Sequence, residues 1–494
     1  MPTGNAAPDL DRLRGRQVLV AGAGISGRAV IGTLADLGAQ VTVTDVNTDS
    51  LALAAEAGAA TVPLAQLLAN RNEIAQFALV VTSPGFRPDA PILAAAAGAG
   101  IPIWGDIELT WRIDCAEIYG PPRRWLFVTG TNGKTTTTSM LDAILNAGGL
   151  SSVACGNIGL PVIDALQMSP PAEVLAVELS SFQLFWAPSV RPEAGAVLNI
   201  AEDHLDWHGG MAGYIAAKAQ ALTGRVAVVG LDDPVAAELG RDCPADATVG
   251  FRLGDPGPGE LGIVAGELVD GAFGDASILA SADGILPPGA AGLLDALAAA
   301  ALARAVGVAP EAVAAGLASH QVGPHRGAVA AVVGGVSYID DSKATNPHAA
   351  RSSLLAHERV VWIAGGQLKG AAIDDLVIEV APRLAGVVLL GQDADVIATA
   401  LARHAPQVPV VKAQPGDHDG VDPVGVEALM DAVVASAAEL ARPGDAVVLA
   451  PAAASLDMFD SYGHRGRLFA AAAQALPDDS GSGAAGYTDS PGTS

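Results

Sequence analysis

The stretch VTGTNGKTTT contains residue types that hold nucleotide phosphates in a loop between a strand and a helix. Gly130 and Gly133 permit a tight turn with inward-facing backbone N–H groups, and Lys134 can reach the β- and γ-phosphates. Thr135 can offer its hydroxyl to Mg²⁺. The usual phosphate-loop pattern has a glycine where this chain has Val128, so a bare glycine turn is the alternative. Because such a turn seldom places Gly-Lys-Thr between a strand and a helix, the stretch favours a nucleotide site.

Metal-binding residues are expected near this loop, because phosphoryl transfer uses a cation held by oxygen ligands. LAVELSS places Glu178 at the carboxyl end of a predicted strand, the edge where open parallel sheets bind ligands. NIAEDHLDWH follows the next strand and offers Asp203, His204, Asp206 and His208. We select His204, with a solvated acidic turn as the alternative for each of these four side chains.

A second glycine-rich turn precedes the phosphate loop. GAGISG presents Gly22, Gly24 and Gly27 after a strand, and Asp45 ends the next strand, as in dinucleotide-binding folds. An NAD-dependent dehydrogenase and a turn needed only for packing are both open from these residues. The turn TSPG ends a third strand at the same predicted edge, where an ordinary β-turn is the alternative.

The C-terminal third contains further polar turns. PHRG contributes Arg326, DDSKATNP packs acids, a hydroxyl and Lys343 into one loop, and GGQLKG places Lys369 at a strand end. Each alone could be a polar turn, but together they indicate another anion-binding face. Lys218 differs, because it lies in the Ala-rich helical stretch YIAAKAQAL, where the residues alone predict a surface lysine.

Strand-like runs in three blocks position these residues. Apolar runs alternate with Ala-rich helical stretches, which predicts α/β domains with parallel sheets. The runs are QVLVAG, QVTVTD and ALVVTSPG; then WLFVTG, EVLAVELSS, GAVLNI and RVAVVG; then VVWIAGG, AGVVLLG and DAVVLAPAAAS. Residues 250–290 favour β-hairpins at a sheet edge, a helical run is expected from about 292 to 318, and the C-terminal PDDSGSGAAGYTDSPGTS is typical of a disordered tail.

Bulk composition narrows the classes of function. The 494 residues predict two or three domains, and the formal charge of −26 makes nonspecific binding to nucleic acid or anionic lipid unfavourable. The three cysteines lack the spacing of a disulfide framework or a zinc site, so we expect buried free thiols. The N-terminal residues lack a signal-peptide core, and no apolar stretch has membrane-spanning length, so we expect a cytoplasmic protein.

The ordered motifs TGTNGKTTT, ELSSFQL, NIAEDHLDWH with YIAAK, PHRG, DDSKATN, GGQLKG and APAAASLDMF resemble the Mur ligases across almost the whole chain. The resemblance implies three domains: a Rossmann-like UDP-binding domain over 1–114, a central ATP-binding domain of P-loop type over 115–321, and a Rossmann-like amino-acid-binding domain over 322–476. A disordered tail would follow over 477–494. It further implies that the first glycine turn serves a UDP-sugar and not NAD.

The resemblance also assigns roles to individual residues. ATP would meet Gly130, Thr131, Asn132, Gly133, Lys134, Thr135, Thr136, Asp295, Arg326, Asp341 and Lys343. The UDP-substrate would meet Gly24, Ile25, Ser26, Asp45, Val46, Asn47, Ser83, Gly85, Asn157 and His204, and D-glutamate would meet Thr345, Lys369, Ser455 and Tyr462. Thr135, Glu178, His204 and Lys218 would serve two Mg²⁺ sites, and Lys134, Glu178, His204 and Lys218 would be catalytic, with Lys218 carbamylated. This role replaces the surface prediction for Lys218.

The implied reaction is ATP-driven amide formation in peptidoglycan precursor synthesis, joining D-glutamate to UDP-N-acetylmuramoyl-L-alanine through an acyl phosphate in a cytoplasmic monomer. Two departures from the family pattern affect the adenine contacts: Ala291, Gly292 and Asp295 replace the usual residues before the third domain, and Gly327 and Ala328 follow Arg326 where an acid is usual. Three alternatives remain: another ligase of the superfamily, acting at a different cell-wall step or in folate polyglutamylation; an NAD-dependent dehydrogenase; and an ATP-gated binding module.

Overall fold

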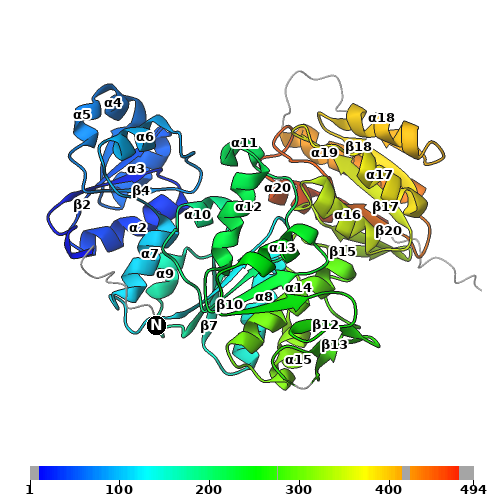
Figure 1. The fold of residues 1–494 in the computed structure, drawn as a ribbon. Coiled ribbons are helices and arrows are strands. Elements are labelled where there is room, and N and C mark those ends of the chain that lie inside the picture. Colours follow the sequence, from blue (N-terminus) through cyan, green and yellow to red (C-terminus); the bar gives the residue numbers. More distant parts are fainter. Residues whose placement is uncertain (1–9, 275, 414–422, 478–494) are drawn as a thin grey trace, which may run out of the picture. The chain divides into compact units, whose positions relative to one another are not determined.

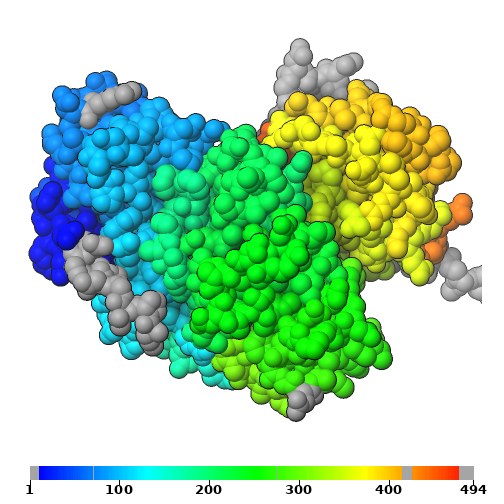
Figure 2. All heavy atoms as spheres, in the orientation of Figure 1, coloured from blue at the N-terminus to red at the C-terminus, as the bar shows by residue number. Residues whose placement is uncertain are grey.

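The computed structural model describes residues 10–274, 276–413 and 423–477. The chain divides into two compact units, Met1–Ile285 with Gly292–His320, and Leu286–Ala291 with Gln321–Ser494. Figure 1 shows the elements of each unit, and Figure 2 shows their surfaces in the same colours along the chain. The tail predicted to be disordered lies, from residue 478 onward, outside the described residues.

The first unit begins with a five-stranded sheet in the order β3-β2-β1-β4-β5, and its strand pairs are all parallel. The strands are β1 (Gln17–Ala21), β2 (Gln40–Asp45), β3 (Ala60–Pro63), β4 (Leu79–Thr82) and β5 (Ile103–Gly105). The helices are α2 (Ile25–Asp36), α3 (Thr48–Glu56), α4 (Leu64–Ala69), α5 (Arg71–Ile74), α6 (Pro91–Gly98) and α7 (Asp106–Cys115). The order in which the chain adds strands to the sheet reverses between β1 and β4, and such a switch point is where open α/β sheets bind ligands.

Both faces of this sheet are buried, as β1 illustrates. Val18 and Val20 belong to one apolar cluster, while Leu19 and Ala21 belong to another. Because successive strand side chains point to opposite faces, this division requires apolar cover on both sides. The continuous apolar run QVLVA is therefore the expected sequence for this strand.

The second sheet of the first unit has nine strands in the order β14-β13-β12-β11-β10-β9-β6-β8-β7. Its parallel part contains β6 (Arg124–Thr129), β7 (Ser152–Gly156), β8 (Val174–Glu178), β9 (Ala194–Val197), β10 (Val226–Gly230), β11 (Ala247–Phe251) and β12 (Glu260–Val264). β13 (Glu267–Asp270) and β14 (Ser277–Ser281) extend it antiparallel, which confirms the hairpins predicted for 250–290.

Helices of this second sheet carry many of the candidate site residues. They are α8 (Lys134–Ala147), α9 (Val162–Leu166), α10 (Ser181–Phe185), α11 (Leu205–His208), α12 (Met211–Ala219), α13 (Pro234–Asp242), α14 (Ala290–Ala305) and α15 (Pro310–Ser319), with a 3₁₀ turn η1 (Gln220–Leu222). The helical run expected from about 292 to 318 is thus two helices, α14 and α15. A turn at Gly307, whose φ is +91°, lies between them.

The second unit contains a six-stranded sheet in the order β15-β16-β20-β17-β18-β19. Its strands are β15 (Ala328–Val333), β16 (Val336–Asp340), β17 (Val360–Gly365), β18 (Leu384–Leu390), β19 (Val410–Lys412) and β20 (Ala446–Leu449). Only the β15–β16 pair is antiparallel among these described strands. The helices are α16 (Pro347–Leu355), α17 (Asp374–Val380), α18 (Ala394–His404), α19 (Pro423–Leu440) and α20 (Tyr462–Gln474), with a 3₁₀ turn η2 (Ala381–Arg383).

Three parallel-rich sheets confirm the α/β fold class, but one expectation from composition was wrong. Cys155 is buried, whereas Cys115 is exposed and Cys243 is partly exposed. Cys115 is the last residue of α7 and does not face a core, so its position on the helix sets its exposure. In the described part of the chain, no helix combines the length and apolar character needed to cross a membrane.

Candidate active site

The phosphate-type loop connects β6 to α8 and is held by Asn199, two residues after the end of β9. Asn199 accepts a hydrogen bond from the Asn132 N–H at 2.9 Å and donates its side-chain amide to the Asn132 carbonyl at 3.1 Å. The Thr131 N–H donates to the Asn199 carbonyl at 3.0 Å. The Lys134 ammonium group donates to the carbonyls of Gly130 and Thr131, at 2.9 and 2.8 Å. The loop is therefore preformed, with its lysine folded back over it.

Gly133 is required where the loop enters the helix. Its φ is +86°, and an added Cβ would lie 2.3 Å from Asp295 Oδ1. That carboxylate also accepts a hydrogen bond from Thr137 Oγ1 at 3.0 Å. Asp295, one of the residues that departs from the family pattern, thus lies against the phosphate-type loop and is nearly buried.

We expect Gly133→Ala to raise the KM for ATP at least tenfold, because it combines a left-handed backbone with a clash against Asp295. Initial rates at varied ATP would measure this. Gly149→Ala is the matched control, because Gly149 has a φ of +79° after the same helix but no neighbour within 4 Å of the added Cβ. An equal rise in the control would contradict the loop-specific effect.

Glu178 ends β8 beside this loop and is 2% exposed. Its Oε2 accepts a hydrogen bond from Thr135 Oγ1 at 2.6 Å, and its Oε1 accepts one from Asn157 Nδ2 at 2.9 Å. Gly156 lets the two strands approach, since an added Cβ would lie 2.3 Å from the Glu178 carbonyl. The structure therefore brings Thr135, Glu178 and Asn157 together, although the sequence assigned Asn157 to the UDP-substrate.

His204 has a left-handed backbone, with φ of 52°, immediately before α11. Its ring centroid lies 4.7 Å from that of Phe182, and its Nε2 lies 3.5 Å from Asp203 Oδ2. The side chain is 50% exposed, so it is accessible to a ligand. His208 instead packs against the Tyr214 ring, and burial lowers its pKa to about 4.

Lys218 is 1% exposed, so the surface position predicted from its helical neighbours was wrong. Its Nζ donates to the Gly130 carbonyl at 2.7 Å and lies 3.3 Å from Thr129 Oγ1. Burial, with the neighbouring Lys134 charge, holds the pKa of Lys218 well below its usual range. A buried amine with a lowered pKa therefore faces the phosphate-type loop.

The metal-ligand expectation can be tested against these groups. Among the described residues, no three His, Cys, Asp or Glu side chains converge as a ready metal site. Mg²⁺ commonly takes one or two protein oxygens and completes its shell with phosphates and water. The Glu178 carboxylate, hydrogen-bonded to the Thr135 hydroxyl at 2.6 Å, fits that type of site.

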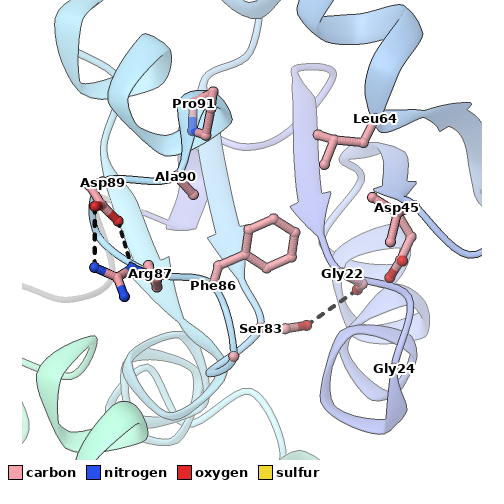
Figure 3. A pocket seen from close by; sticks show the side chains of 12 residues that line it. Gly22, Gly24, Asp45, Leu64, Ser83, Phe86, Arg87, Asp89, Ala90 and Pro91 are labelled. Carbon is pink, nitrogen blue, oxygen red and sulfur yellow. Dashed lines mark hydrogen bonds and ion pairs between the residues drawn. The ribbon is translucent and has the colours of Figure 1, made fainter. Parts of the chain in front are cut away.

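A cavity of about 720 Å³ opens at the switch point between β1 and β4. Its 12 lining residues, shown in Figure 3, are Gly22, Gly24, Asp45, Val46, Leu64, Ser83, Gly85, Phe86, Arg87, Asp89, Ala90 and Pro91. Five of the UDP-substrate candidates line it: Gly24, Asp45, Val46, Ser83 and Gly85. Ile25, Ser26 and Asn47 adjoin these residues in sequence, whereas Asn157 and His204 do not line the cavity.

The three glycines of this turn are explained by different physical requirements. An added Cβ would lie 2.4 Å from Ser83 Oγ at Gly22 and 1.9 Å from the Gly22 carbonyl at Gly27, so both permit close packing. A Cβ added at Gly24 would have no neighbour within 4 Å, and Gly24 borders the cavity. Asp45 accepts hydrogen bonds from the backbone N–H groups of Ala23 and Asn47, at 2.7 and 2.9 Å. The packing-only alternative thus explains two glycines but not Gly24.

The sequence prediction missed part of the cavity wall. Phe86 and Leu64 supply apolar surface, and Arg87 is held by Asp89 at 3.0 Å. Arg87 is the only cation among the 12 lining residues. Its position directly after the TSPGF turn was the signal that could have identified it.

Asp106 begins α7 and lies near Ser26 and Gln183. Within the described structure, its buried Oδ1 has no hydrogen-bond partner. Burial raises the pKa of this carboxyl to about 6, against hydrogen bonds from Gln183 and Ser26 that lower it.

Asp106→Asn should therefore stabilise the protein at pH 8. Since the folded pKa is raised, the favourable contribution of wild-type Asp106 is complete below about pH 4 and is lost as pH rises through 6. The asparagine cannot ionise, so the free energy of unfolding should gain about 2–3 kcal/mol at pH 8 and little at pH 4. Denaturant unfolding at both pH values measures the difference; equal effects would contradict the buried charge.

In the second unit, most candidate residues lie in loops that follow β16, β17 and β20, whereas Arg326 precedes β15 and Tyr462 begins α20. Lys343 Nζ lies 3.9 Å from the ring centroid of Tyr462. Burial raises the pKa of Asp341 to about 7, with the Arg326 charge opposing the rise. Thr345 donates its N–H to the Lys343 carbonyl at 2.8 Å.

The other amino-acid candidates occupy two loops joined by backbone. Gln367 and Ala454 exchange N–H···O bonds of 2.9 Å each. This pairing brings the loop of Lys369, which is exposed and has φ of 54°, next to the loop of Ser455, which is buried.

Arg465 of α20 holds these loops together and was missed from the sequence. It is 1% exposed and donates to Ser342 Oγ at 3.0 Å and to the carbonyls of Gly365 and Ala453, both at 3.3 Å. Burial lowers its pKa to about 10. A guanidinium has enough donors to satisfy several loop carbonyls at once, which fixes the relative positions of the three loops.

Family models match three parts of the chain: a Mur ligase MurD-like N-terminal domain over 16–105, a Mur ligase middle domain over 128–253, and a Mur ligase glutamate ligase domain over 325–453. The chain belongs to the Mur ligase family, a family of ATP-dependent ligases. It has the family's three-domain architecture.

Three similar relatives have the same name, UDP-N-acetylmuramoylalanine–D-glutamate ligase. The relative from Rhodococcus jostii is 69% identical, covering 93% of this chain and 95% of its own length. Those from Nocardia farcinica and Mycolicibacterium smegmatis are 62% and 58% identical, covering 95% and 96% of this chain and 98% and 99% of their own lengths.

Solved structures agree in fold. The UDP-N-acetylmuramate-alanine ligase of Thermotoga maritima has a TM-score of 0.54 at 18% identity, covering 93% of this chain and 99% of its own. The UDP-N-acetylmuramoylalanyl-D-glutamyl-2,6-diaminopimelate–D-alanyl-D-alanyl ligase of Acinetobacter baumannii has a TM-score of 0.56 at 17% identity, covering 95% of this chain and 98% of its own.

Proposed function

We propose that this ligase joins D-glutamate to UDP-N-acetylmuramoyl-L-alanine at the expense of ATP, in peptidoglycan precursor synthesis. The observation that carries the proposal is the 69% identity, over 93% of the chain, to a relative with that name. Two features of the structure support the proposal. The preformed loop with Lys134 suits the triphosphate of ATP, and the cavity at the β1–β4 switch point suits a nucleoside diphosphate.

In the first half of the reaction, the L-alanyl carboxylate attacks the γ-phosphate of ATP and displaces ADP, giving an acyl phosphate. Lys134 would exchange its two loop carbonyls for phosphate oxygens and offset the charge that develops on them. Bound Mg²⁺ supplies Lewis-acid stabilisation of the phosphoryl oxygens. Thr135 and Glu178 would hold the first cation, and His204 with Lys218 the second.

Lys218 would act as a carbamate. The lowered pKa favours the neutral amine, which can add to CO₂ and lose a proton to give an anionic, carboxylate-like carbamate. Such a group beside the Gly130 carbonyl would provide an anionic oxygen ligand for a cation.

In the second half, the amine of D-glutamate attacks the acyl carbon, phosphate leaves, and the amide forms. We assign D-glutamate to Thr345, Lys369, Ser455 and Tyr462, and the ATP phosphates and ribose partly to Arg326, Asp341 and Lys343. These residues belong to the second compact unit, so their approach to Lys134 is part of the proposal. Water must be excluded during this step, because an acyl phosphate hydrolyses.

The UDP end is assigned to the cavity residues with Ile25, Ser26 and Asn47, which leaves no role for NAD. The domain boundaries at 114/115 and 321/322, a monomeric state and a cytoplasmic location are parts of the same proposal. Sedimentation of the purified chain would test the monomer.

The direct test is phosphate release from ATP and Mg²⁺ with UDP-N-acetylmuramoyl-L-alanine, adding amino acids one at a time. Release that depends on D-glutamate, with a matching amide product, is the expected result. Release only with another amino acid or acceptor would move the chain to a different ligation step, and binding of ATP without turnover would favour a binding module.

A further inference from the structure

Two tryptophans contact the loop that forms one wall of the N-terminal cavity. Trp207 Nε1 donates to the Gly85 carbonyl at 3.4 Å, and Trp186 Nε1 donates to the Phe86 carbonyl at 3.4 Å. Gly85 and Phe86 both line the cavity, and Phe86 lies in its wall between Arg87 and Ser83 in Figure 3. The two indoles, which do not line the cavity themselves, therefore bind this wall through its backbone carbonyls.

Phe185 lies between the two indoles. Its ring centroid is 4.9 Å from that of Trp186 and 5.2 Å from that of Trp207, edge-on to each. We call Phe185, Trp186 and Trp207 the aromatic bracket. Phe185 is 41% exposed whereas Trp207 is only 8% exposed, so the bracket extends from the surface into the apolar core.

The two tryptophans of the bracket belong to the two segments that carry the candidate catalytic residues Glu178 and His204. Trp186 follows α10, whose segment starts just after Glu178, and Trp207 lies in α11, just after His204. Phe182 connects them, with ring centroids 4.7 Å from both His204 and Trp207.

One ionic contact parallels the indole hydrogen bonds. Arg87 Nη1 of the cavity wall lies 3.9 Å from Asp206 Oδ2 of α11. Both side chains are well exposed, at 46% and 86%, so this contact contributes little by itself. The Trp207 indole bond therefore links the wall to α11 more specifically than this ion pair does, and the Trp186 indole bond links the wall to the residue after α10.

We propose that Trp186 and Trp207 are positioning residues for the nucleotide end of the substrate, holding the cavity wall in register with the segments of Glu178 and His204. The inference rests on the proposed function, since it assumes a substrate whose nucleotide binds in the cavity and whose carboxylate reacts at the phosphate-type loop. Productive geometry requires the reacting atoms to meet within about 3–3.5 Å, so an error at the anchored end is transmitted to the reacting end.

The test uses Trp186→Phe, Trp207→Phe and the double variant of the full-length chain. Phenylalanine keeps a ring against Phe185 and removes the N–H donor. We expect the dissociation constant for UDP, measured by calorimetric titration, to rise about fivefold in each single variant and at least tenfold in the double variant. The KM for UDP-N-acetylmuramoyl-L-alanine should rise in parallel, and the KM for ATP should not change.

Trp362→Phe is the matched control, because Trp362 Nε1 also donates to a backbone carbonyl, that of Ala450, at 2.7 Å, but in the second unit. It should lower Tm and leave UDP affinity unchanged. A second readout is an acceptor without the uridine diphosphate: the double variant and the wild type should use it with equal kcat/KM.

The outcomes separate the two proposals. Unchanged UDP affinity in both single variants, with lowered Tm, would assign the bracket a purely structural role and overturn the inference. A wild-type enzyme that binds UDP but does not use D-glutamate would refute the proposed reaction, while the titration would still decide the role of the bracket. A wild-type chain that does not bind UDP would overturn both.

Discussion

Lys134→Ala abolishes phosphate release, with kcat lower by about 10³-fold or more, while the variant still folds and still binds UDP. The reason is that Lys134 is the cation at the N-terminus of α8, directly after a preformed loop, where it can neutralise charge that develops on transferred phosphoryl oxygens. Stopped assays of phosphate and amide product at saturating substrates measure the effect. UDP titration reports the separate cavity.

Part of the activity lost in Lys134→Ala would be lost through an effect on Lys218. Lys134 and Lys218 both donate to the Gly130 carbonyl, and the Lys134 charge contributes to the lowered pKa of Lys218. Removal of Lys134 therefore also raises the pKa of Lys218 and reduces its neutral fraction. Lys134→Met would have the same effect, whereas Lys134→Arg would retain the charge and the repulsion but not the compact ammonium geometry.

Lys412→Ala is the matched control for the loss of a lysine, because Lys412 is exposed and paired with Asp395. It should retain full activity. Near-normal turnover by Lys134→Ala would contradict the phosphate-loop assignment, and loss of UDP binding or of the unfolding transition would show that the substitution had damaged the fold instead.

The phosphate-type loop was predictable because its chemistry is local. Gly130, Gly133, Lys134 and Thr135 are contiguous, and a strand and a helix flank them, so residue type and periodicity together define the geometry. The three sheets followed from apolar runs of strand length in the same way. Glu178 was also accessible to this reasoning, because a strand end fixes its edge of the sheet.

Lys218 was not predictable from its neighbours, because burial is decided by packing between distant segments. Its helix contacts the Thr129–Gly130 end of β6, about 90 positions earlier in the chain, and an Ala-rich helix gives no sign of which face is covered. Only the resemblance to a family indicated its role. Arg465 and the aromatic bracket are similar cases, since their partners are backbone carbonyls, which no side-chain pattern reveals.

Lys218→Ala should lower kcat by about 10²–10³-fold, and a short carboxylic acid such as acetate should restore part of it. Burial lowers the pKa of Lys218 and so favours the neutral amine that carbamate formation needs, and the alanine variant leaves a space in which a small carboxylate can replace the lost oxygen ligand. Rates at increasing acetate concentration, with chloride at equal ionic strength as the reference, measure the rescue.

Lys218→Met is the control that separates a missing carboxylate from a missing side chain. Methionine fills the same volume without charge, so it should lose as much activity as alanine but show no rescue, because no space remains for acetate.

Wild-type enzyme should lose activity in buffer stripped of CO₂ and recover it with bicarbonate. Because burial lowers the pKa of Lys218, this recovery should extend to lower pH than it would for an exposed lysine, and it should fall as the amine becomes protonated. Indifference of the wild type to CO₂, together with unrescued Lys218→Ala, would leave Lys218 as a hydrogen-bond donor to the Gly130 carbonyl and remove the carbamate from the mechanism.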